Sequence, residues 1–203
     1  MKEGIVYVKS FSAPEVDRRE VLRYAGIRDS SEQIDALLSE CIREAQTRLT
    51  YKACFREYKI SRICDEIDLG FTRVRSESME NLLVGCDRIV VLCASVGVDM
   101  DRLIARYAVI SPARSVMLQA LGTERVEALC DSLSSELREA YKGEGCETTH
   151  RFSPGYGDLS LEVQRDIFDS LECEKKIGVT LGDNLFMTPA KSVTAIIGIK
   201  NAK

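Results

Sequence analysis

Hydrophobic and polar residues alternate along this 203-residue chain with the periods typical of helices and strands. In its first third, a short strand is predicted over residues 5–8. A capping box at 12–15 (Ser-Ala-Pro-Glu) then predicts a helix that ends at Gly26. A second box at 30–33 predicts a longer amphipathic helix. Residues 51–63 alternate well enough to form one or two strands with one solvated face.

The middle of the chain predicts the centre of the fold. A short helix is expected over 76–83. The continuous apolar run at 89–94 is typical of a central strand that is buried on both faces. A helix follows over 99–109 and ends before Pro112. The longest helical pattern in the sequence then runs from 114 to 141.

One carboxylate on this long helix is a candidate binding residue. Gly122 marks a point where the helix could kink. Beyond it, one stripe is apolar (Val126, Leu129, Cys130, Leu133, Leu137, Ala140, Tyr141). Glu127 lies about 100° from the middle of that stripe, at the boundary between core and solvent. A carboxylate there can enter a cleft without complete desolvation, although an ordinary solvated charge is the alternative.

The segment 151–158 (Arg-Phe-Ser-Pro-Gly-Tyr-Gly-Asp) carries the most distinctive local chemistry. Pro154 fixes φ, and Gly155 can take the positive φ that a type II turn requires. A turn with so little side-chain bulk lets a small molecule reach the main chain, and Arg151 offers a forked donor for a carboxylate or phosphate. The alternative is a surface turn with a solvated arginine.

The last part of the chain completes the prediction of the fold class. Ser160 is expected to cap a helix over 161–171, and strands are expected at 177–181 and 192–199. Helices and strands mix without regular β–α alternation, so we expect an α+β fold with a mixed or antiparallel twisted sheet flanked by helices. We expect two portions, 1–85 and a core at 86–203 that carries the turn, together forming one compact domain.

Composition narrows the partners and the chemistry. The net charge is −4 and the basic residues are scattered, which argues against nucleic acid as the main partner. No apolar run approaches the roughly 18 residues of a membrane span, and a strand that begins at Ile5 leaves no room for a signal peptide, so a cytoplasmic protein is expected.

The eight cysteines form no C-x-x-C pair, so we expect buried thiols rather than a metal site. A single histidine, His150, disfavours triads and histidine-rich metal sites. A near match to G-x-G-x-x-G at 155–160 lacks the third glycine and the acidic partner of a dinucleotide site.

Three motifs in order support a more specific hypothesis. They are Arg151-x-Ser153-Pro154-Gly155-Tyr156, Ile177-Gly178-Val179-Thr180-Leu181 and Met187-x-Pro189-x-x-Ser192-Val193. Together they resemble the reactivation domain of cobalamin-dependent methionine synthase, where an R-x-x-P-G-Y turn, an I-G-V-T-L strand and an M-x-P-x-x-S-V segment have the same order and similar separations. The preceding helix is similar too. The resemblance covers about residues 86 to 199, and the first third of the chain has no recognised counterpart.

The resemblance implies a function and a set of binding residues. In that family the domain binds S-adenosylmethionine, which supplies a methyl group when a flavodoxin-type donor reduces inactive cob(II)alamin. By this likeness, Arg151 would pair with the ligand's carboxylate and Glu127 with its ammonium or another polar group. Ser153 and Gly155 would offer main-chain hydrogen bonds, and Tyr156 a ring or hydroxyl contact. No catalytic residue is expected, because reduced cobalamin is itself the nucleophile and the protein supplies alignment.

Departures from the family pattern leave two functions open. Ile197 stands where the family has a tyrosine, and an N-terminal aspartate that helps hold the ligand has no clear equivalent. Thr148-Thr149 precede His150, so the D-x-H-x-x-G segment that ligates cobalamin is missing and the corrinoid must come on another protein. We favour an activation subunit that brings S-adenosylmethionine to a separately encoded, cobalamin-loaded methionine synthase. The alternative is a non-catalytic module that docks on a corrinoid methyltransferase without binding S-adenosylmethionine.

Overall fold

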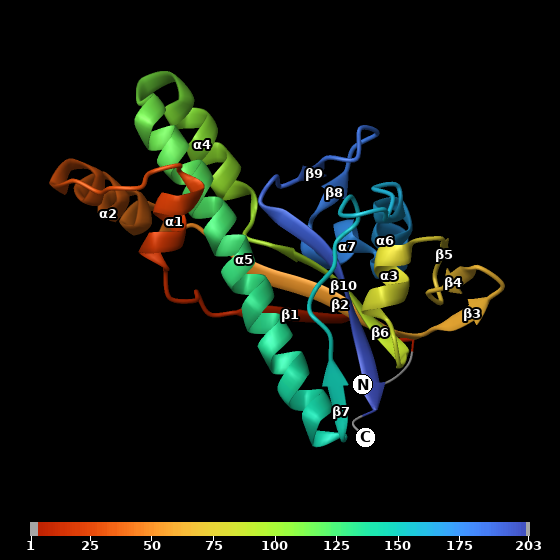
Figure 1. Ribbon diagram of the computed structural model, residues 1–203. Helices are drawn as coiled ribbons and strands as arrows, with labels where there is room; N and C mark the ends of the chain where they lie inside the picture. The colour runs from red at the N-terminus through yellow and green to blue at the C-terminus, as the bar shows by residue number, and fades with distance from the viewer. Residues whose placement is uncertain (1–3, 202–203) are drawn as a thin grey trace.

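The computed structural model describes residues 4–201 and confirms the α+β class (Figure 1). Its centre is a five-stranded sheet in the order β1-β2-β6-β10-β7, in which every pairing is antiparallel. The strands are β1 (Tyr7–Phe11), β2 (Tyr51–Lys59), β6 (Cys86–Ser95), β10 (Ser192–Asn201) and β7 (Cys146–Thr148). Strands from both ends of the chain therefore hydrogen-bond within one sheet.

Both faces of the central strand are buried, as the continuous apolar run predicted. Val90, Leu92 and Ala94 belong to one hydrophobic cluster. The intervening Ile89, Val91 and Cys93 belong to a second cluster on the opposite face. Successive side chains in a strand point to opposite faces, so a strand with helices on both sides needs apolar residues at every position.

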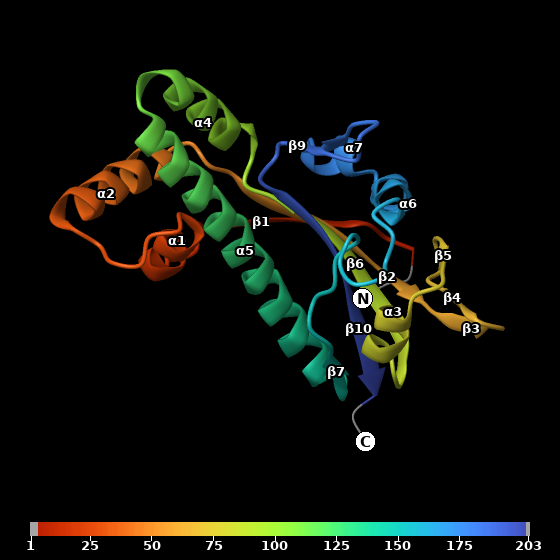
Figure 2. The same cartoon turned by 45° about the horizontal axis from the view of Figure 1, so that its top comes forward.

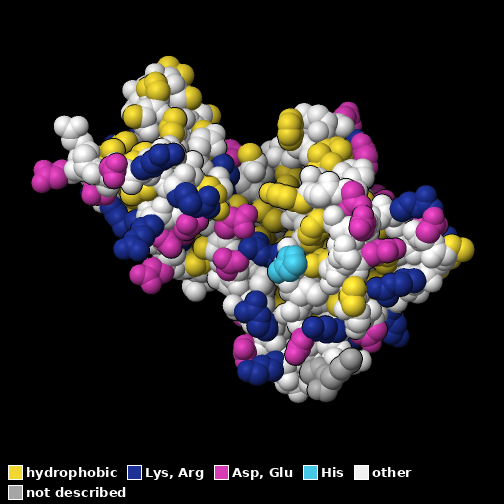
Figure 3. Space-filling model, viewed as in Figure 1, with side chains coloured by type: hydrophobic (Ala, Val, Ile, Leu, Met, Phe, Trp, Pro, Cys, Tyr) yellow, Lys and Arg dark blue, Asp and Glu magenta, His cyan; other side chains and the backbone are white. Residues whose placement is uncertain are grey.

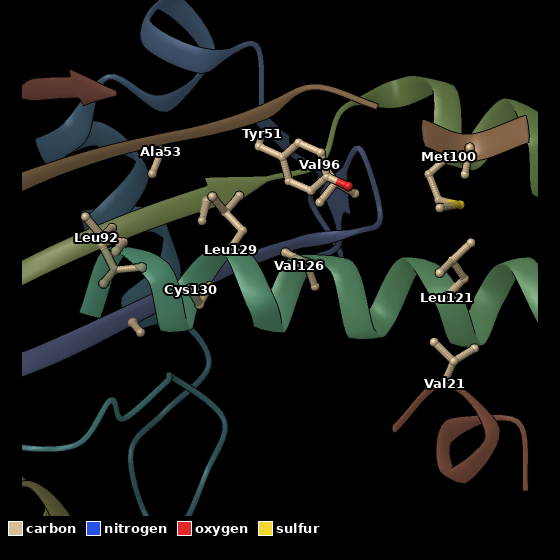
Figure 4. Packing of buried hydrophobic residues seen from close by; sticks show 14 of the residues in the cluster. Val21, Tyr51, Ala53, Leu92, Val96, Met100, Leu121, Val126, Leu129 and Cys130 are labelled. Carbon is tan, nitrogen blue, oxygen red and sulfur yellow. The ribbon is translucent and has the colours of Figure 1, made fainter. Parts of the chain in front are cut away.

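A single long helix covers the first face of the sheet. Helix α5 (Pro112–Gly143) has 32 residues and is therefore about 48 Å long. Figure 4 shows Val126, Leu129 and Cys130 of α5 packed toward the sheet. Helices α1 (Arg18–Tyr24), α2 (Glu32–Gln46) and α4 (Val98–Ile110) pack against α5 in turn.

Gly122 allows α4 to approach the long helix closely. The helix runs through this residue without interruption. A Cβ placed on Gly122 would lie 2.8 Å from Met100 Cγ and 3.0 Å from Lys191 Cγ, so any larger residue would force these neighbours away. The glycine therefore permits close packing, and it does not end a helical segment.

Shorter elements cover the second face, which Figure 2 shows on the side away from α5. They are α3 (Glu77–Leu82), α6 (Val163–Leu171) and α7 (Cys173–Ile177), with a small sheet of β3 (Ser61–Ile63), β4 (Glu66–Asp68) and β5 (Arg73–Val74), and a hairpin of β8 (Thr180–Leu181) and β9 (Met187–Thr188). Residues 51–63 thus form two strands, as expected, but the expected solvated face is wrong for β2. Cys54 and Tyr58, on the same side of the strand as Lys52 and Arg56, are buried in the second cluster. In residues 4–201 no helix is both long and apolar enough to cross a membrane.

The start of α1 differs from the prediction. The helix does not begin at the Ser12–Glu15 box, and Asp17 is the residue that caps it, accepting from the N–H groups of Arg19 and Glu20. The buried Arg125 of α5 instead binds the carbonyls of Pro14 and Glu15, which holds this segment outside the helix. A tertiary contact has overridden a local capping signal.

The expected strand over 177–181 is also mostly wrong. Residue Ile177 ends α7, and Gly178 follows it with φ of 72°, a left-handed C-cap. Only Thr180 and Leu181 pair as a strand. A glycine just after a helical turn is a common stop signal, and it outweighed the β-branched residues around it.

Candidate functional site

The turn at residues 153–157 is anchored to the main sheet at its start. Phe152 pairs with Ile196 of β10, and the two residues exchange N–H···O bonds of 2.9 and 2.8 Å. Gly155 has φ of 89°, as the type II turn required. Its N–H donates to the carbonyl of Leu159 at 2.9 Å, which closes the turn on itself.

A carboxylate just after the turn ties it to helix α3. Asp158 accepts from Ser76 Oγ at 2.6 Å, from the Glu77 N–H at 2.6 Å and from the Ser78 N–H at 3.1 Å. Hydrogen bonds from Ser76 and Ser78 and the two backbone N–H groups stabilise the charged form, so the pKa of Asp158 lies well below its usual range. Gly157, with φ of 56°, sits so close to α3 that a Cβ would lie 2.5 Å from Ser78 Oγ.

On its other side, the turn is tied to helix α5 by an arginine. Arg151 Nη2 lies 3.2 Å from Glu127 Oε2 and 2.6 Å from Asp131 Oδ1. Partial burial opposes the charge of Arg151, but its neighbours outweigh this effect and the pKa of the guanidinium is raised. Glu127 is 40% exposed, which agrees with its expected place at the boundary between core and solvent.

Between α5 and the turn lies a cavity of about 400 Å³. Figure 3 shows His150 at the edge of this hollow, with acidic and basic side chains beside it. Its lining residues are Glu127, Asp131, Ser134, Arg138, Thr149, His150, Arg151, Phe152, Ser153, Tyr156 and Val193.

A smaller cavity of about 190 Å³ adjoins the first. The two share Glu127, Ser153, Tyr156 and Val193. The remaining residues of the smaller cavity are Pro154, Gln164, Met187, Ser192 and Thr194. We call the first the charged cavity and the second, in which the shared Glu127 is the one charged lining residue, the smaller cavity. A larger hollow of about 750 Å³ beside α6 and α7 contains none of the residues expected from the sequence.

The structure brings most of the expected site residues together. Glu127, Ser153 and Tyr156 line both cavities, and Arg151 lines the charged one. Gly155 does not line either cavity, and because its N–H is already bonded, it serves here to shape the turn. Tyr156 is 69% exposed, so its ring is free to contact a ligand.

Several lining residues were missed from the sequence. Asp131 stands four residues after Glu127, a spacing that puts both carboxylates on one face of α5 and could have been recognised. Arg138 and His150 also line the charged cavity. Gln164 comes from α6, and nothing in its local sequence connects it to the turn.

The chemistry available at this site is binding rather than nucleophilic attack. Burial raises the pKa of the nearby Cys130 to about 12, so this thiol is neutral. Across the chain Cys64 is exposed and the other seven cysteines are buried, which agrees with the prediction of thiols that serve as small hydrophobes. Within residues 4–201, no three His, Cys, Asp or Glu side chains gather as a metal site. What remains is a mixed set of charges, hydroxyls and an exposed aromatic ring around adjoining cavities.

Comparison with known proteins agrees with the fold and the motifs. The crystal structure of the MetH reactivation domain bound to AdoHcy is similar, with a TM-score of 0.72 and 16% sequence identity. The similarity covers 97% of this chain and 78% of that one, so most of the segment before residue 76 shares the fold. The protein is thus an α+β domain of the reactivation-domain type. No curated protein matches the sequence.

A family model assigns the chain more specifically. The model described as "Vitamin B12 dependent methionine synthase, activation domain" matches residues 76–202, more than half of the sequence. The chain therefore belongs to this family, and the resemblance carried by the turn and the two later motifs is confirmed.

Proposed function

We propose that this protein binds S-adenosylmethionine beside the turn and acts as a free-standing activation subunit for a cobalamin-loaded methionine synthase. The observation that carries the proposal is the convergence of Arg151, Glu127, Ser153 and Tyr156 on two adjoining cavities. Membership of the activation-domain family and the AdoHcy bound to a structurally similar domain support it.

The residues present suit a ligand that carries both a negative carboxylate and positive ammonium and sulfonium groups. Arg151 offers two parallel N–H donors for a carboxylate, and Glu127 and Asp131 lie on the same side to receive an ammonium or sulfonium. On binding, the ligand's charged groups would replace the ion pairs that Arg151 now makes with Glu127 and Asp131. The charged cavity, at about 400 Å³, is within the usual range of 300–1,000 Å³ for small-molecule sites.

The ligand, when bound, supplies an activated methyl group on a sulfonium, which needs no general base to leave. The role of the protein is then to hold the ligand and to orient its methyl group. The turn is fixed to β10 through Phe152 and to α3 through Asp158, so the side chains that would bind the ligand are mounted on rigid elements. Alignment of two reactants can contribute up to about 7–11 kcal/mol in favourable cases.

The corrinoid is the substrate in this proposal and comes on the partner, a methionine synthase or another corrinoid protein. A flavodoxin-type protein is the proposed electron donor. The net charge of −4 does not by itself select among these partners.

Calorimetric titration with S-adenosylmethionine tests the proposal. We expect saturable binding that Arg151→Ala weakens roughly 10- to 150-fold, since a hydrogen bond to a charged group contributes about 1.5–3 kcal/mol. Loss of the ion pairs should itself cost little stability, because Glu127 and Asp131 are 40% and 72% exposed and stay hydrated without their partner. The Arg151 side chain is 20% exposed, so its truncation also removes packing, and a melting scan verifies that the variant is folded.

Arg73→Ala, which removes an exposed ion pair with Asp68 in the β4–β5 hairpin, is the matched control and should leave binding unchanged. No binding to the folded wild-type protein at millimolar ligand would refute the proposal.

One observation favours the second candidate, a docking module without ligand. The charge of Arg151 is already compensated by two carboxylates of its own chain. If the titration shows no binding while the protein associates with a cobalamin-loaded methionine synthase in gel filtration, the docking module is the better description.

A further inference from the structure

Three buried thiols meet beneath helix α7, apart from the site described above. Cys54 of β2 and Cys93 of β6 are partners in the register of the central sheet, and Cys173 is the first residue of α7. All three belong to the second hydrophobic cluster, and none is more than 1% exposed. Each member of this thiol cluster hydrogen-bonds to the other two. In residues 4–201 no set of side chains, this one included, is arranged to hold a metal ion, so the chemistry open to the cluster is that of thiols with one another.

The positions of the three residues favour one pairing. A disulfide needs Cβ atoms about 3.5–4.5 Å apart, whereas directly opposed residues on neighbouring antiparallel strands have theirs about 4.5–5.5 Å apart. The sheet therefore disfavours a bridge between Cys54 and Cys93. Helix α7 packs against β2, and the spacing of the strands does not constrain a side chain that comes from a helix above them. Cys173 is therefore the better partner for Cys54.

The protonation of the cluster suits a reaction between these two residues. Hydrogen bonds from Cys173 and Cys93 stabilise the thiolate of Cys54 and lower its pKa to about 4. The pKa of Cys173 is raised, chiefly by its hydrogen bond with Cys54. The cluster thus holds a charged sulfur, which is the form of cysteine that reacts with an oxidant, beside a protonated thiol that can resolve the oxidised product.

The helix that covers the thiol cluster is short. Cys173 lies in the wall of the hollow of about 750 Å³ beside α6 and α7. Helix α7 has five residues and is bounded by left-handed residues at both ends, Glu172 with φ of 51° and Gly178 with φ of 72°. So short a helix has few hydrogen bonds of its own, and it opens locally at a lower free energy than the sheet beneath it. An oxidant close in size to water then reaches the cluster from the hollow.

We propose that the thiol cluster is a redox switch in which hydrogen peroxide joins Cys54 to Cys173 by a disulfide that fixes α7 to β2. The Cys54 thiolate attacks one oxygen of the peroxide and becomes a sulfenic acid, while the O–O bond breaks and the other oxygen leaves as hydroxide. That hydroxide takes up the proton that Cys54 had released. The Cys173 sulfur then attacks the sulfenic sulfur, the S–S bond forms, and the sulfenic oxygen leaves as water with the Cys173 proton. Two thiols and one peroxide thus give one disulfide and two waters. This inference does not depend on the proposed function.

Oxidation of the folded wild-type protein with hydrogen peroxide, followed by peptide mapping without reduction, tests the proposal. We expect one disulfide, between Cys54 and Cys173, that dithiothreitol removes. It should raise Tm by about 4–16 °C, because the bridge closes a long loop of the unfolded chain. Cys173→Ala should lose both the disulfide and the rise in Tm. Cys130→Ala, which removes a buried thiol of the first hydrophobic cluster, is the matched control and should keep both.

The exposed Cys64 reports whether the oxidant has acted. If Cys64 is oxidised while the three thiols of the cluster stay free, the cluster serves packing alone and the switch is refuted. A bridge between Cys54 and Cys93, or one that persists in Cys173→Ala, refutes the role of Cys173. A melting scan before oxidation shows whether each variant is folded, and if Cys173→Ala is not, the map of the wild-type protein decides.

Discussion

Replacing Gly157 by alanine should loosen the turn from helix α3. Gly157 has φ of 56°, and a Cβ built on it would lie 2.5 Å from Ser78 Oγ and 3.2 Å from Ser78 Cβ. The substitution therefore has two costs, a left-handed backbone for a residue with a Cβ and a steric overlap with α3.

The first cost can be measured separately. Gly145, just beyond the end of α5, has φ of 73° and nothing within 4 Å of an ideal Cβ. Gly145→Ala should therefore show only the backbone cost of about 1–2 kcal/mol. Gly157→Ala adds the cost of overpacking, about 1–3 kcal/mol, for a total of about 2–5 kcal/mol.

Thermal unfolding followed by circular dichroism is the assay. For a domain of this length, each kcal/mol lowers Tm by about 2–4 °C. Gly145→Ala should then lower Tm by about 2–8 °C, and Gly157→Ala should lower it by about 4–20 °C. The Gly157→Ala substitution should also displace Asp158 from α3 and weaken ligand binding. Adding Ser78→Ala removes the closest atom, so it should recover part of the loss in the Gly157→Ala background.

Two results would contradict this reasoning. Equal losses of stability in Gly145→Ala and Gly157→Ala would mean that the overlap with α3 relaxes at no cost. Strict additivity of Ser78→Ala and Gly157→Ala would mean that Ser78 is not the neighbour that matters.

Two further predictions concern hydrogen bonds that hold the fold. Tyr141 donates to the buried Glu57 at 2.5 Å, so Tyr141→Phe should lower the free energy of unfolding by about 1.5–3 kcal/mol in urea titrations, and no change would show that the pair adds nothing. The pKa of Asp158 is depressed in the folded protein, so its contribution is present above the unfolded value of about 3.9 and is lost as the pH falls toward the folded value. The stability gap between wild type and Asp158→Asn should therefore narrow below about pH 4, and a constant gap would disprove the role of the charge.

Much of the fold could be read from local sequence. Ser76 caps its helix at the start of the predicted segment, and Ser31 caps α2 one residue after the Ser30 that opens the predicted box. A side-chain oxygen that bonds the first free N–H groups is a purely local device. The run at 89–94 identified the central strand, because a strand covered on both faces has apolar residues throughout. The turn at 154–155 and the later motifs were sufficient to recognise the family.

Other features were decided only when distant segments met. The start of α1 depends on Arg125, more than a hundred residues away, because a buried guanidinium took the carbonyls that an earlier helix start would have used. Similarly, the sequence indicated Arg151 and Glu127 as site residues, but it did not indicate that their side chains would bind each other.

The smaller cavity beside the turn is the clearest case of a feature decided by tertiary structure. Gln164 is an ordinary polar residue of an amphipathic helix by every local measure. It lines the smaller cavity because α6 packs on the sheet and buries its amide beside the turn. Local signals depend on neighbours within a few residues, whereas burial and cavity lining depend on packing between elements far apart in the chain. The sequence by itself therefore determined the elements and the family, and the tertiary structure decided which polar groups face the site.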